Sequence, residues 1–431
     1  MLDIQFIRDN PELVAEKARQ KGYVVDVTQL LGYDKERREL LNQAEDLRKK
    51  RNEIASANKG QRPSEEQVEE GRKIKEELAD LDPKLDSISL EFNELLKHVP
   101  NMPLEDVPVG ASEDENVVVK QWGKKPEFDF EPKNHWQIGE AKGWIDKERA
   151  TKVAASRFVY LKGDLVLMEF ALWQFALSKL TDENVIKELI SANKLDVSPK
   201  AFIPVLPPAV AKKEVFEATG RLNKEEQTYK IEDEDLWLNA SAEHTLAPMH
   251  LNEILNEADL PLRYVGYTTA FRREAGTYGK DMEGILRLHQ FNKLEMESFT
   301  TPDKSLDEHF LMVAIQEYLM QQLELPYQLL NKCTADIGFP NAKGMDIEVW
   351  LPGQDKYRET HTADYITDFQ AQSMKTRVRL KDGSVVLAHT NDATAFSERP
   401  LIGIIENFQT AEGNVKVPDV LQPFMGGKTV I

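Results

Sequence analysis

Residues 267–296 read YTTAFRREAGTYGKDMEGILRLHQFNKLEM, and this stretch decides the architecture of the chain. One β-prone run ends near Arg272, a loop rich in glycine and charge follows, and a second strand-like run spans Ile285–Leu294. Alternate side chains of a strand point to the same face of a sheet. One face would therefore present five polar or aromatic side chains: Arg287, His289, Phe291, Lys293 and Glu295. Such a face suits the floor of a binding site better than a core.

The side-chain types on this face match the parts of a nucleotide and an amino acid. An arginine pairs with phosphate through two hydrogen bonds, an aromatic ring stacks on a purine, and a carboxylate holds an ammonium group. The chain has no G-x-x-x-x-G-K-[ST] loop and no G-x-G-x-x-G after a strand, so side chains would have to hold the phosphates. From this pattern alone, an ordinary solvent-exposed sheet face stays open as an alternative.

The segments around this stretch predict an α+β domain built on a mostly antiparallel sheet and flanked by helices. Helical periodicity marks Asp164–Leu180 and Leu306–Leu323. Strand-like runs occupy Leu262–Thr268, Met345–Trp350, Thr376–Leu380 and Ser384–His389.

The N-terminal part predicts two long helices over residues 29–57 and 64–98. Apolar residues of the second helix alternate spacings of four and three, as in a coiled-coil seam: Ile74, Leu78, Leu81, Leu85, Ile88, Phe92 and Leu95. Gly60 and Pro63 separate the helices, and Ser64 with Gln67 forms a capping pattern. We expect an antiparallel hairpin, with a kink at Pro83.

Bulk composition sets the remaining limits. The 431 residues suggest two or three units, and we expect residues 1–105 and 106–431 as domains, joined by a linker at about 99–115. No apolar run predicts a membrane span and no signal peptide is recognisable, so we expect a cytoplasmic protein. The single cysteine, Cys333, excludes a cysteine-rich zinc site. A net charge of −19 means that any RNA partner must meet a local basic patch.

The sequence resembles the seryl-tRNA synthetase family. FRREAG followed by GILRLHQFNKLE is similar to motif 2 of class II aminoacyl-tRNA synthetases, and its HQF-x-K-x-E ending is similar to that of the seryl enzymes. Leu206-Pro207-Pro208 resembles the end of motif 1, which builds the dimer interface in this class. VVLAHTNDATAFSERPLIGIIENFQ, residues 385–409, resembles motif 3. The similarity extends in order from MLDIQFIRDNPELV at the N-terminus to PDVLQPFMGG near the C-terminus.

The resemblance implies a homodimeric, ATP- and Mg²⁺-dependent serine–tRNA ligase. Such an enzyme makes seryl-adenylate and transfers serine to the 3′ end of tRNA(Ser), with tRNA(Sec) as an open second acceptor. It also implies a catalytic set of Arg272, Glu359 and Arg399, and magnesium ligands Glu359 and Thr362. The implied ATP-binding residues are Arg272, Arg273, Glu274, Arg287, Leu288, Phe291, Glu359, Thr360, His361, Thr362 and Arg399. The implied serine-binding residues are Ser241, Ala242, Glu243, Arg272, Glu295 and Thr394.

The helical hairpin would bind the tRNA. The segment from Asp34 to Arg62 contains nine lysines and arginines and six acidic residues, although a solvated helix face would give the same pattern. The tRNA-binding residues that the resemblance implies are Arg37, Arg38, Arg48, Lys49, Lys50 and Arg51.

Several positions depart from the family pattern. Ser241 stands where the family has threonine, Arg273 replaces a small residue, Asp392 replaces an asparagine, and ETHTADY replaces a stretch rich in serine and cysteine. Two other hypotheses therefore stay open: an adenylating enzyme that loads a carrier protein, and a non-catalytic RNA-binding protein. The retained hairpin disfavours the first, and the retained Arg272, Glu295, Glu359 and Arg399 disfavour the second.

Overall fold

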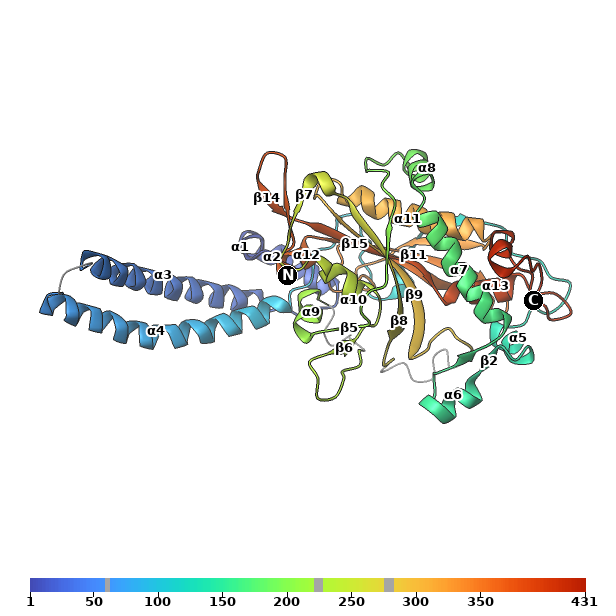
Figure 1. Ribbon diagram of the computed structural model, residues 1–431, viewed down its shortest axis with the longest axis horizontal. Coiled ribbons are helices and arrows are strands. Elements are labelled where there is room, and N and C mark those ends of the chain that lie inside the picture. The colour runs from blue at the N-terminus through green and yellow to red at the C-terminus, as the bar shows by residue number, and fades with distance from the viewer. Residues whose placement is uncertain (59–62, 221–227, 275–282) are drawn as a thin grey trace. The chain divides into compact units, whose positions relative to one another are not determined.

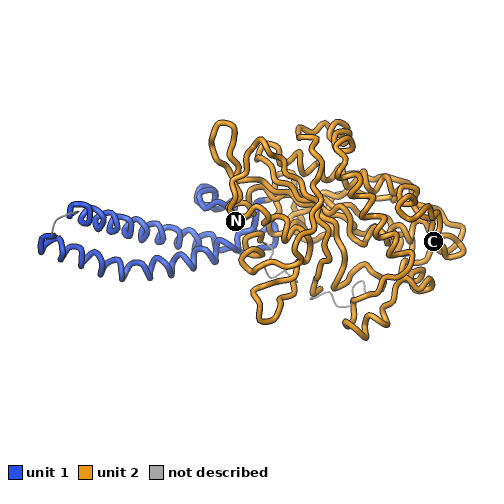
Figure 2. Tube along the Cα trace, viewed as in Figure 1, with its two compact units in different colours: residues 1–102 blue, residues 103–431 orange. Residues whose placement is uncertain are grey.

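The computed structural model describes residues 1–58, 63–220, 228–274 and 283–431. It divides into two compact units, Met1–Met102 and Pro103–Ile431 (Figure 2). The division falls inside the stretch in which we expect the linker. Gly60 and most of the loop between the two strands of the opening stretch lie outside the described residues.

The N-terminal unit consists of helices. They are α1 (Ile4–Asp9), α2 (Pro11–Gln20), α3 (Val27–Ala57) and α4 (Glu65–Lys97). Figure 1 shows α3 and α4 running side by side, which confirms the predicted helical arm. Ala44 of α3 packs against Ile74 and Leu78, which are two positions of the seam predicted for α4. The helix α4 continues through Pro83.

Local capping explains where α4 begins. Ser64 Oγ accepts a hydrogen bond from the Gln67 backbone N–H at 3.2 Å, and Gln67 Oε1 accepts one from the Ser64 N–H at 2.9 Å. This reciprocal pair satisfies two N–H groups that a helix start would otherwise leave without partners. The capping pattern expected from the sequence is therefore confirmed.

The second unit is built on a sheet of eight strands. All neighbouring pairs are antiparallel except β4–β8. In spatial order the strands are β1 (Val117–Trp122), β10 (Tyr327–Asn331), β11 (Lys343–Leu351), β12 (Lys356–Thr367), β15 (His389–Ser397), β9 (Gln290–Thr300), β8 (Leu262–Phe271) and β4 (Ile203–Val205). The predicted α+β class with a mostly antiparallel sheet is confirmed.

Helices α7, α11 and α13 pack on this sheet and enclose the main hydrophobic core (Figure 1). The helices of the unit are α5 (His135–Ala141), α6 (Lys147–Ala154), α7 (Asp164–Leu180), α8 (Glu183–Asn193), α9 (Lys213–Ala218), α10 (Glu243–Leu246), α11 (Ser305–Gln322), α12 (Phe369–Met374) and α13 (Arg399–Asn407). Short strands pair outside the sheet: β2 (Ile145–Asp146) with β3 (Tyr160–Leu161), β5 (Val210–Ala211) with β6 (Trp237–Leu238), and β13 (Arg377–Arg379) with both β7 (Ile254–Asn256) and β14 (Val385–Leu387).

One predicted strand starts later than expected. The run Ile285–Leu294 was expected to be extended throughout, but β9 begins only at Gln290. Before that point the chain turns at Gly284 and Ile285, and the His289 ring bonds to Arg272 O at 2.9 Å and packs against Phe158, outside the cavity lining. Arg287 and His289 therefore do not belong to the alternating face of the strand, and the expectation that all five side chains share it is wrong.

Two bulges in the sheet decide which side chains share a face. In β12, Glu359 pairs with Glu348 and His361 with Ile347, so Thr360 is an extra residue between them. In β15, Thr394 pairs with Glu295 and Phe396 with Leu294, so Ala395 is extra. One extra residue brings side chains three positions apart to the same face. Glu359 and Thr362 share a face for this reason, as do Thr394 and Ser397.

Candidate active site

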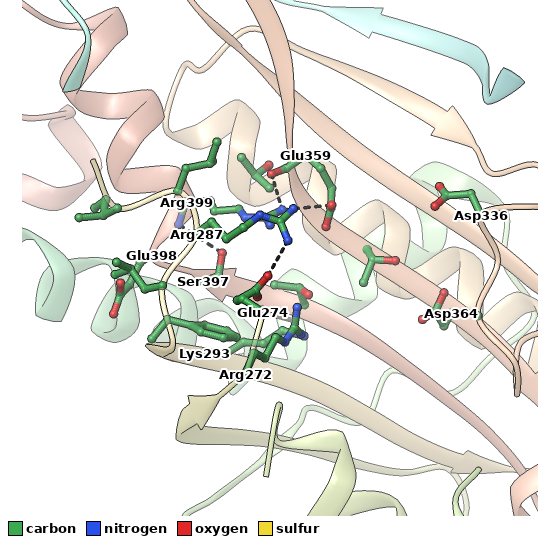
Figure 3. A pocket seen from close by; sticks show the side chains of 18 of the residues that line it. Arg272, Glu274, Arg287, Lys293, Asp336, Glu359, Asp364, Ser397, Glu398 and Arg399 are labelled. Carbon is green, nitrogen blue, oxygen red and sulfur yellow. Dashed lines mark hydrogen bonds and ion pairs between the residues drawn. The ribbon is translucent and has the colours of Figure 1, made fainter. Parts of the chain in front are cut away.

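A cavity of about 240 Å³ opens on the sheet between β8, β9, β12, β15 and the start of α13. Many of the ATP- and serine-binding residues that the resemblance implies line this cavity, as Figure 3 shows for the labelled ones. These are Arg272, Glu274, Arg287, Leu288, Phe291, Glu359, Thr360, Thr362, Thr394 and Arg399.

Two arginines and two glutamates form one end of the cavity. Arg399 Nη1 lies 3.1 Å from Glu359 Oε2 and donates to the Glu359 carbonyl at 2.8 Å. Arg287 Nη1 donates to Glu274 Oε2 at 2.6 Å. Figure 3 shows the side chains of Arg287 and Arg399 alongside each other. Two guanidinium groups at one end of a cavity form a site for a polyanion.

The electrostatics at this end keep Glu359 charged. Partial burial would raise its pKa, but the charges of Arg399 and Lys332 outweigh that effect and bring the pKa to about 2. The carboxylate is therefore ionised at neutral pH and remains about half exposed. A bound polyanion would compete with Glu359 for Arg399, and the carboxylate would then be available to a cation.

Arg272 and Phe291 lie next to each other. The Arg272 guanidinium carbon is 5.0 Å from the centre of the Phe291 ring, and Arg272 Nε donates to Ala240 O at 3.2 Å. Leu288 is buried in the same wall. The pair places a phosphate-binding cation beside an aromatic face, which is the arrangement that a purine nucleotide needs.

The residues expected to bind serine form a buried charged cluster. Lys293 Nζ lies 2.5 Å from Glu295 Oε2, 3.0 Å from Ser241 Oγ and 3.9 Å from Glu243 Oε2. Burial raises the pKa of Glu295 to about 8, although Lys293 acts against this. The cluster has two carboxyl groups and one ammonium group, so it can accommodate a second cation such as the ammonium group of an amino acid.

Lys293 connects this cluster to the cavity. It lines the cavity itself, whereas Ser241, Ala242, Glu243 and Glu295 lie behind it. Sequence reasoning placed Lys293 on the polar face but gave it no role in binding. Its position at alternate spacing between Phe291 and Glu295 is the signal that could have identified it.

The cavity does not include two further residues of the expected ATP-binding set. Arg273 is exposed outside the lining. His361 is fully buried, and its ring bonds to Thr360 Oγ1 at 2.8 Å and to Ala395 O at 3.1 Å. Burial lowers the pKa of His361 to about 3, so the ring is neutral. Its contacts support the two bulged strands.

The acidic end of the cavity was not expected from the sequence. Lys332 lies 3.4 Å from Asp346 and 3.7 Å from Asp336, and Asp364 lines the same end. Figure 3 shows Asp336 and Asp364 on the side of the cavity away from Arg399. These residues come from the loop between β10 and β11, from β11 and from β12, so no local motif unites them.

A magnesium ion fits the oxygen atoms around Glu359. The Thr362 hydroxyl lies opposite the buried Asp346 carboxyl group across β11 and β12, and its hydrogen bond lowers the pKa of Asp346 against the effect of burial. Mg²⁺ prefers one or two carboxylates together with phosphate oxygens. Over the described residues, no three His, Cys, Asp or Glu side chains are arranged to hold a metal by themselves. A metal here would therefore need oxygen ligands from the nucleotide as well.

The basic residues of the arm differ in their surroundings. Arg37 and Arg38 both face Asp34, at 3.5 and 3.1 Å, and Arg37 also packs over the Phe92 ring. Arg48 pairs with Asp82 of α4 at 2.8 Å. Lys49, Lys50 and Arg51 are exposed. The three exposed side chains offer the freer surface for an RNA backbone.

Comparison with known proteins identifies the family. Residues 1–103 match the seryl-tRNA synthetase N-terminal domain, and residues 227–408 match the class II core domain of the G, H, P, S and T synthetases. The chain is 41% identical to the serine–tRNA ligase of Thermodesulfovibrio yellowstonii over 99% of both chains. It belongs to the seryl-tRNA synthetase family.

Other members of the seryl-tRNA synthetase family show the same similarity. The serine–tRNA ligase of Thermotoga neapolitana is 39% identical over the full length of both chains. The crystal structure of seryl-tRNA synthetase from Pyrococcus horikoshii, complexed with ATP, is similar over 100% of this chain and 99% of that chain, with a TM-score of 0.88 and 36% identity. The match to the crystal structure of a cytoplasmic serine–tRNA ligase from Naegleria fowleri in complex with AMP covers 100% of this chain and 98% of that chain, with a TM-score of 0.82 and 29% identity. The predicted family is confirmed.

Proposed function

We infer that this chain is an ATP-dependent serine–tRNA ligase that uses the cavity between β9, β12, β15 and α13 for adenylate formation. One observation carries the assignment of the site. Arg272 and Phe291 lie side by side in a cavity that also holds the Arg399–Glu359 pair, and the Lys293–Glu295 cluster lies directly behind it. This arrangement would allow a nucleotide and an ammonium-bearing substrate to bind next to each other.

The proposed reaction is an in-line displacement at the α-phosphorus of ATP. A carboxylate oxygen of serine forms a bond to phosphorus while the bond to the pyrophosphate oxygen breaks, and pyrophosphate leaves with that electron pair. Negative charge increases on the phosphate oxygens in the transition state, so preorganised cations lower the barrier. Arg272 would stabilise the α-phosphate, and Arg287 and Arg399 would hold the departing end.

The protein would orient both substrates. Phe291 would stack on the adenine, and Glu274 would accept a hydrogen bond from its amino group. Glu295 and Glu243 would hold the serine ammonium group, while Ser241 and Thr394 would line the space for its small hydroxymethyl side chain. Glu359 and Thr362 would hold Mg²⁺, which neutralises phosphate charge when bound.

The second step transfers serine from the adenylate to a terminal ribose hydroxyl of tRNA. That hydroxyl oxygen forms the ester bond, AMP leaves, and the hydroxyl proton goes to solvent or to the phosphate. The helical arm would contact tRNA(Ser) through Lys49, Lys50 and Arg51, since reading of RNA by shape relies on backbone contacts. tRNA(Sec) is a second candidate acceptor for the same assay.

We also propose a homodimer in the cytoplasm. The strand β4 lies at the edge of the large sheet and pairs on one side only, with β8. Ile203 and Leu206 at this edge are 51% and 83% exposed. An exposed apolar edge strand is a surface that a second copy would cover. No helix among the described residues is long and apolar enough to span a membrane.

The decisive experiment measures ATP–pyrophosphate exchange with each of the twenty amino acids, followed by charging of tRNA(Ser). Serine should support exchange far above the other nineteen amino acids, and charging should require the full chain. Exchange with serine but no charging would favour a carrier-loading enzyme. No exchange with any amino acid would leave only a binding function.

A further inference from the structure

Two glutamates that the proposed reaction does not use lie buried against the same asparagine. Glu398 Oε1 accepts a hydrogen bond from the Asn292 backbone N–H at 2.9 Å, and the Asn292 side-chain amide donates to Glu169 Oε1 at 2.8 Å. Glu169 and Glu398 are only 3% and 5% exposed. Asn292 thus joins a carboxyl group of α7 to one that immediately precedes α13.

The orientation of the Asn292 side chain is set from the other side. Thr269 Oγ1 on β8 donates to Asn292 Oδ1 at 2.9 Å, which is consistent with the amide nitrogen facing Glu169. A flipped amide would put its oxygen against the Glu169 carboxyl oxygen, whereas the Thr269 hydroxyl could accept as well as donate. The network therefore fixes a donor, and not an acceptor, against the Glu169 carboxyl group.

The surroundings of the two carboxyl groups contain no compensating cation. Neither forms an ion pair among the described residues, and the second oxygen of Glu398 is buried without a hydrogen-bond partner. Tyr267 of β8 is the titratable side chain that faces both, and Trp173 of α7 is neutral. The guanidinium group of the neighbouring Arg399 is directed at Glu359 instead.

Two carboxylates in such a place cannot both be ionised at little cost. Burial and the charge of Glu169 together raise the pKa of Glu398 to about 8, against the hydrogen bond from the Asn292 N–H. Burial also raises the pKa of Glu169, against its hydrogen bonds from Asn292 and Trp173. Coupled acids of this kind release their protons as a pair and not as independent groups.

The network connects two parts of the proposed ATP site. Asn292 directly follows Phe291 on β9, and Glu398 directly precedes Arg399 at the start of α13. Glu398 itself lies at the edge of the cavity (Figure 3). The Glu398–Asn292 hydrogen bond therefore links the immediate neighbours of two ligand-binding residues. Phe291 would stack on adenine, and Arg399 would hold the γ-phosphate.

We propose that Glu398 and Glu169 retain one proton between them at neutral pH and act as a positioning pair that holds Phe291 and Arg399 in register for ATP. The inference rests on the proposed placement of ATP in this cavity. Loss of the retained proton at alkaline pH places two like charges on either side of Asn292. The repulsion pushes Glu398 at the start of α13 away from Glu169 of α7, which displaces Arg399 and weakens ATP binding, while the serine cluster around Lys293 is not part of this network.

The test compares the pH dependence of ATP–pyrophosphate exchange in three variants. Wild type should show a KM for ATP that rises roughly threefold to tenfold between about pH 7 and about pH 9, with a smaller change in the KM for serine. Glu398→Ala should raise the KM for ATP at every pH, since it leaves the Asn292 N–H without its acceptor. Glu398→Gln should restore most of the ATP affinity at about pH 7 and flatten the alkaline rise. Glu317→Gln, a change outside the cavity, is the control and should keep the wild-type profile.

A second measurement tests, without ATP, whether Glu398 and Glu169 retain a proton at neutral pH. A carboxyl group with a raised pKa in the folded state binds more protons than it does in the unfolded chain, so stability falls as pH rises from about 4.5 towards about 8. The melting temperature of Glu398→Gln relative to wild type should therefore rise across this interval. A constant difference would overturn the retained proton. If the difference in melting temperature changes with pH but the KM for ATP does not, the role in ATP positioning is overturned. Absence of serine-dependent exchange in wild type would instead contradict the proposed function.

Discussion

Arg272 is the residue on which the proposed transition-state stabilisation depends most directly. Arg272→Ala should lower kcat/KM for serine-dependent exchange by roughly a hundredfold to a thousandfold, because it removes a preorganised cation from the α-phosphate. Arg379→Ala, on the exposed face of β13, is a matched control and should stay close to wild type. The melting temperatures of both variants show whether the fold is intact, and near-normal exchange in Arg272→Ala would remove its phosphate role.

Glu295 should determine how tightly serine binds. Glu295→Gln keeps the size of the side chain and removes the carboxyl group, whose ionised form would face the serine ammonium group. The KM for serine should increase by roughly tenfold or more, and the KM for ATP should change much less. Steady-state exchange with each substrate varied in turn measures the two constants. An equal change in both constants would place Glu295 outside the amino-acid pocket.

Alternation along β9 made Phe291, Lys293 and Glu295 predictable, whereas Arg287 reaches the cavity for a reason that the local sequence does not contain. Gly284 adopts a φ of +69°, and a Cβ atom there would lie 1.9 Å from His135 Nε2. His135 also accepts a hydrogen bond from the Ile285 N–H at 3.2 Å. The turn that directs Arg287 thus depends on a side chain about 150 positions away. A pattern read along one segment cannot include such a contact.

At the scale of elements, the stability of the N-terminal end of α3 depends on Asp34. Its carboxylate is 1% exposed and bonds to Arg8 at 2.7 and 2.8 Å, with Arg38 and Arg37 nearby. Burial would raise the pKa of Asp34, but the hydrogen-bonded Arg8 and the nearby charges outweigh it, so the pKa lies below its ordinary value of 3.8. The stabilisation that results is present above the ordinary pKa and is lost as pH falls through the lower, folded value.

Asp34→Asn should therefore unfold at a lower temperature than wild type at about pH 7, and the difference should shrink as the pH falls below the ordinary pKa of aspartate. Thermal melts followed by circular dichroism over that range measure it. Lys35→Gln, an exposed change on the same helix, is the control. A difference that does not vary with pH would mean that the carboxylate charge is unimportant for the arm.

The helices of the arm were predictable because their stability is local, with heptad spacing and a capping box. The bulges at Thr360 and Ala395 were not, since an inserted residue leaves no mark in the composition of a strand. Without the bulge, Glu359 and Thr362 would point to opposite faces of β12. The prediction that these two residues act together therefore came from resemblance, and the geometry that permits it came from the structure.

At the scale of the whole molecule, the two compact units assign separate tasks to separate parts of the chain. Replacing residues 41–88 by a short glycine–serine linker removes most of α3 and α4 but leaves every residue of the cavity in place. This variant should retain serine-dependent exchange within a few-fold of wild type and lose charging of tRNA(Ser). Exchange and charging are measured on the same preparation. Loss of both activities would show that the arm is required for folding of the second unit.

The division between Met102 and Pro103 also affects how such a protein can evolve. If amino-acid choice is made in one unit and recognition of the acceptor in the other, mutations that alter one property leave the other under its own selection. An arm could then follow drift in the shape of its RNA partner while the chemistry of activation stays constant. Chimaeras that exchange arms between distant species would inherit the RNA preference of the donor and the substrate preference of the recipient.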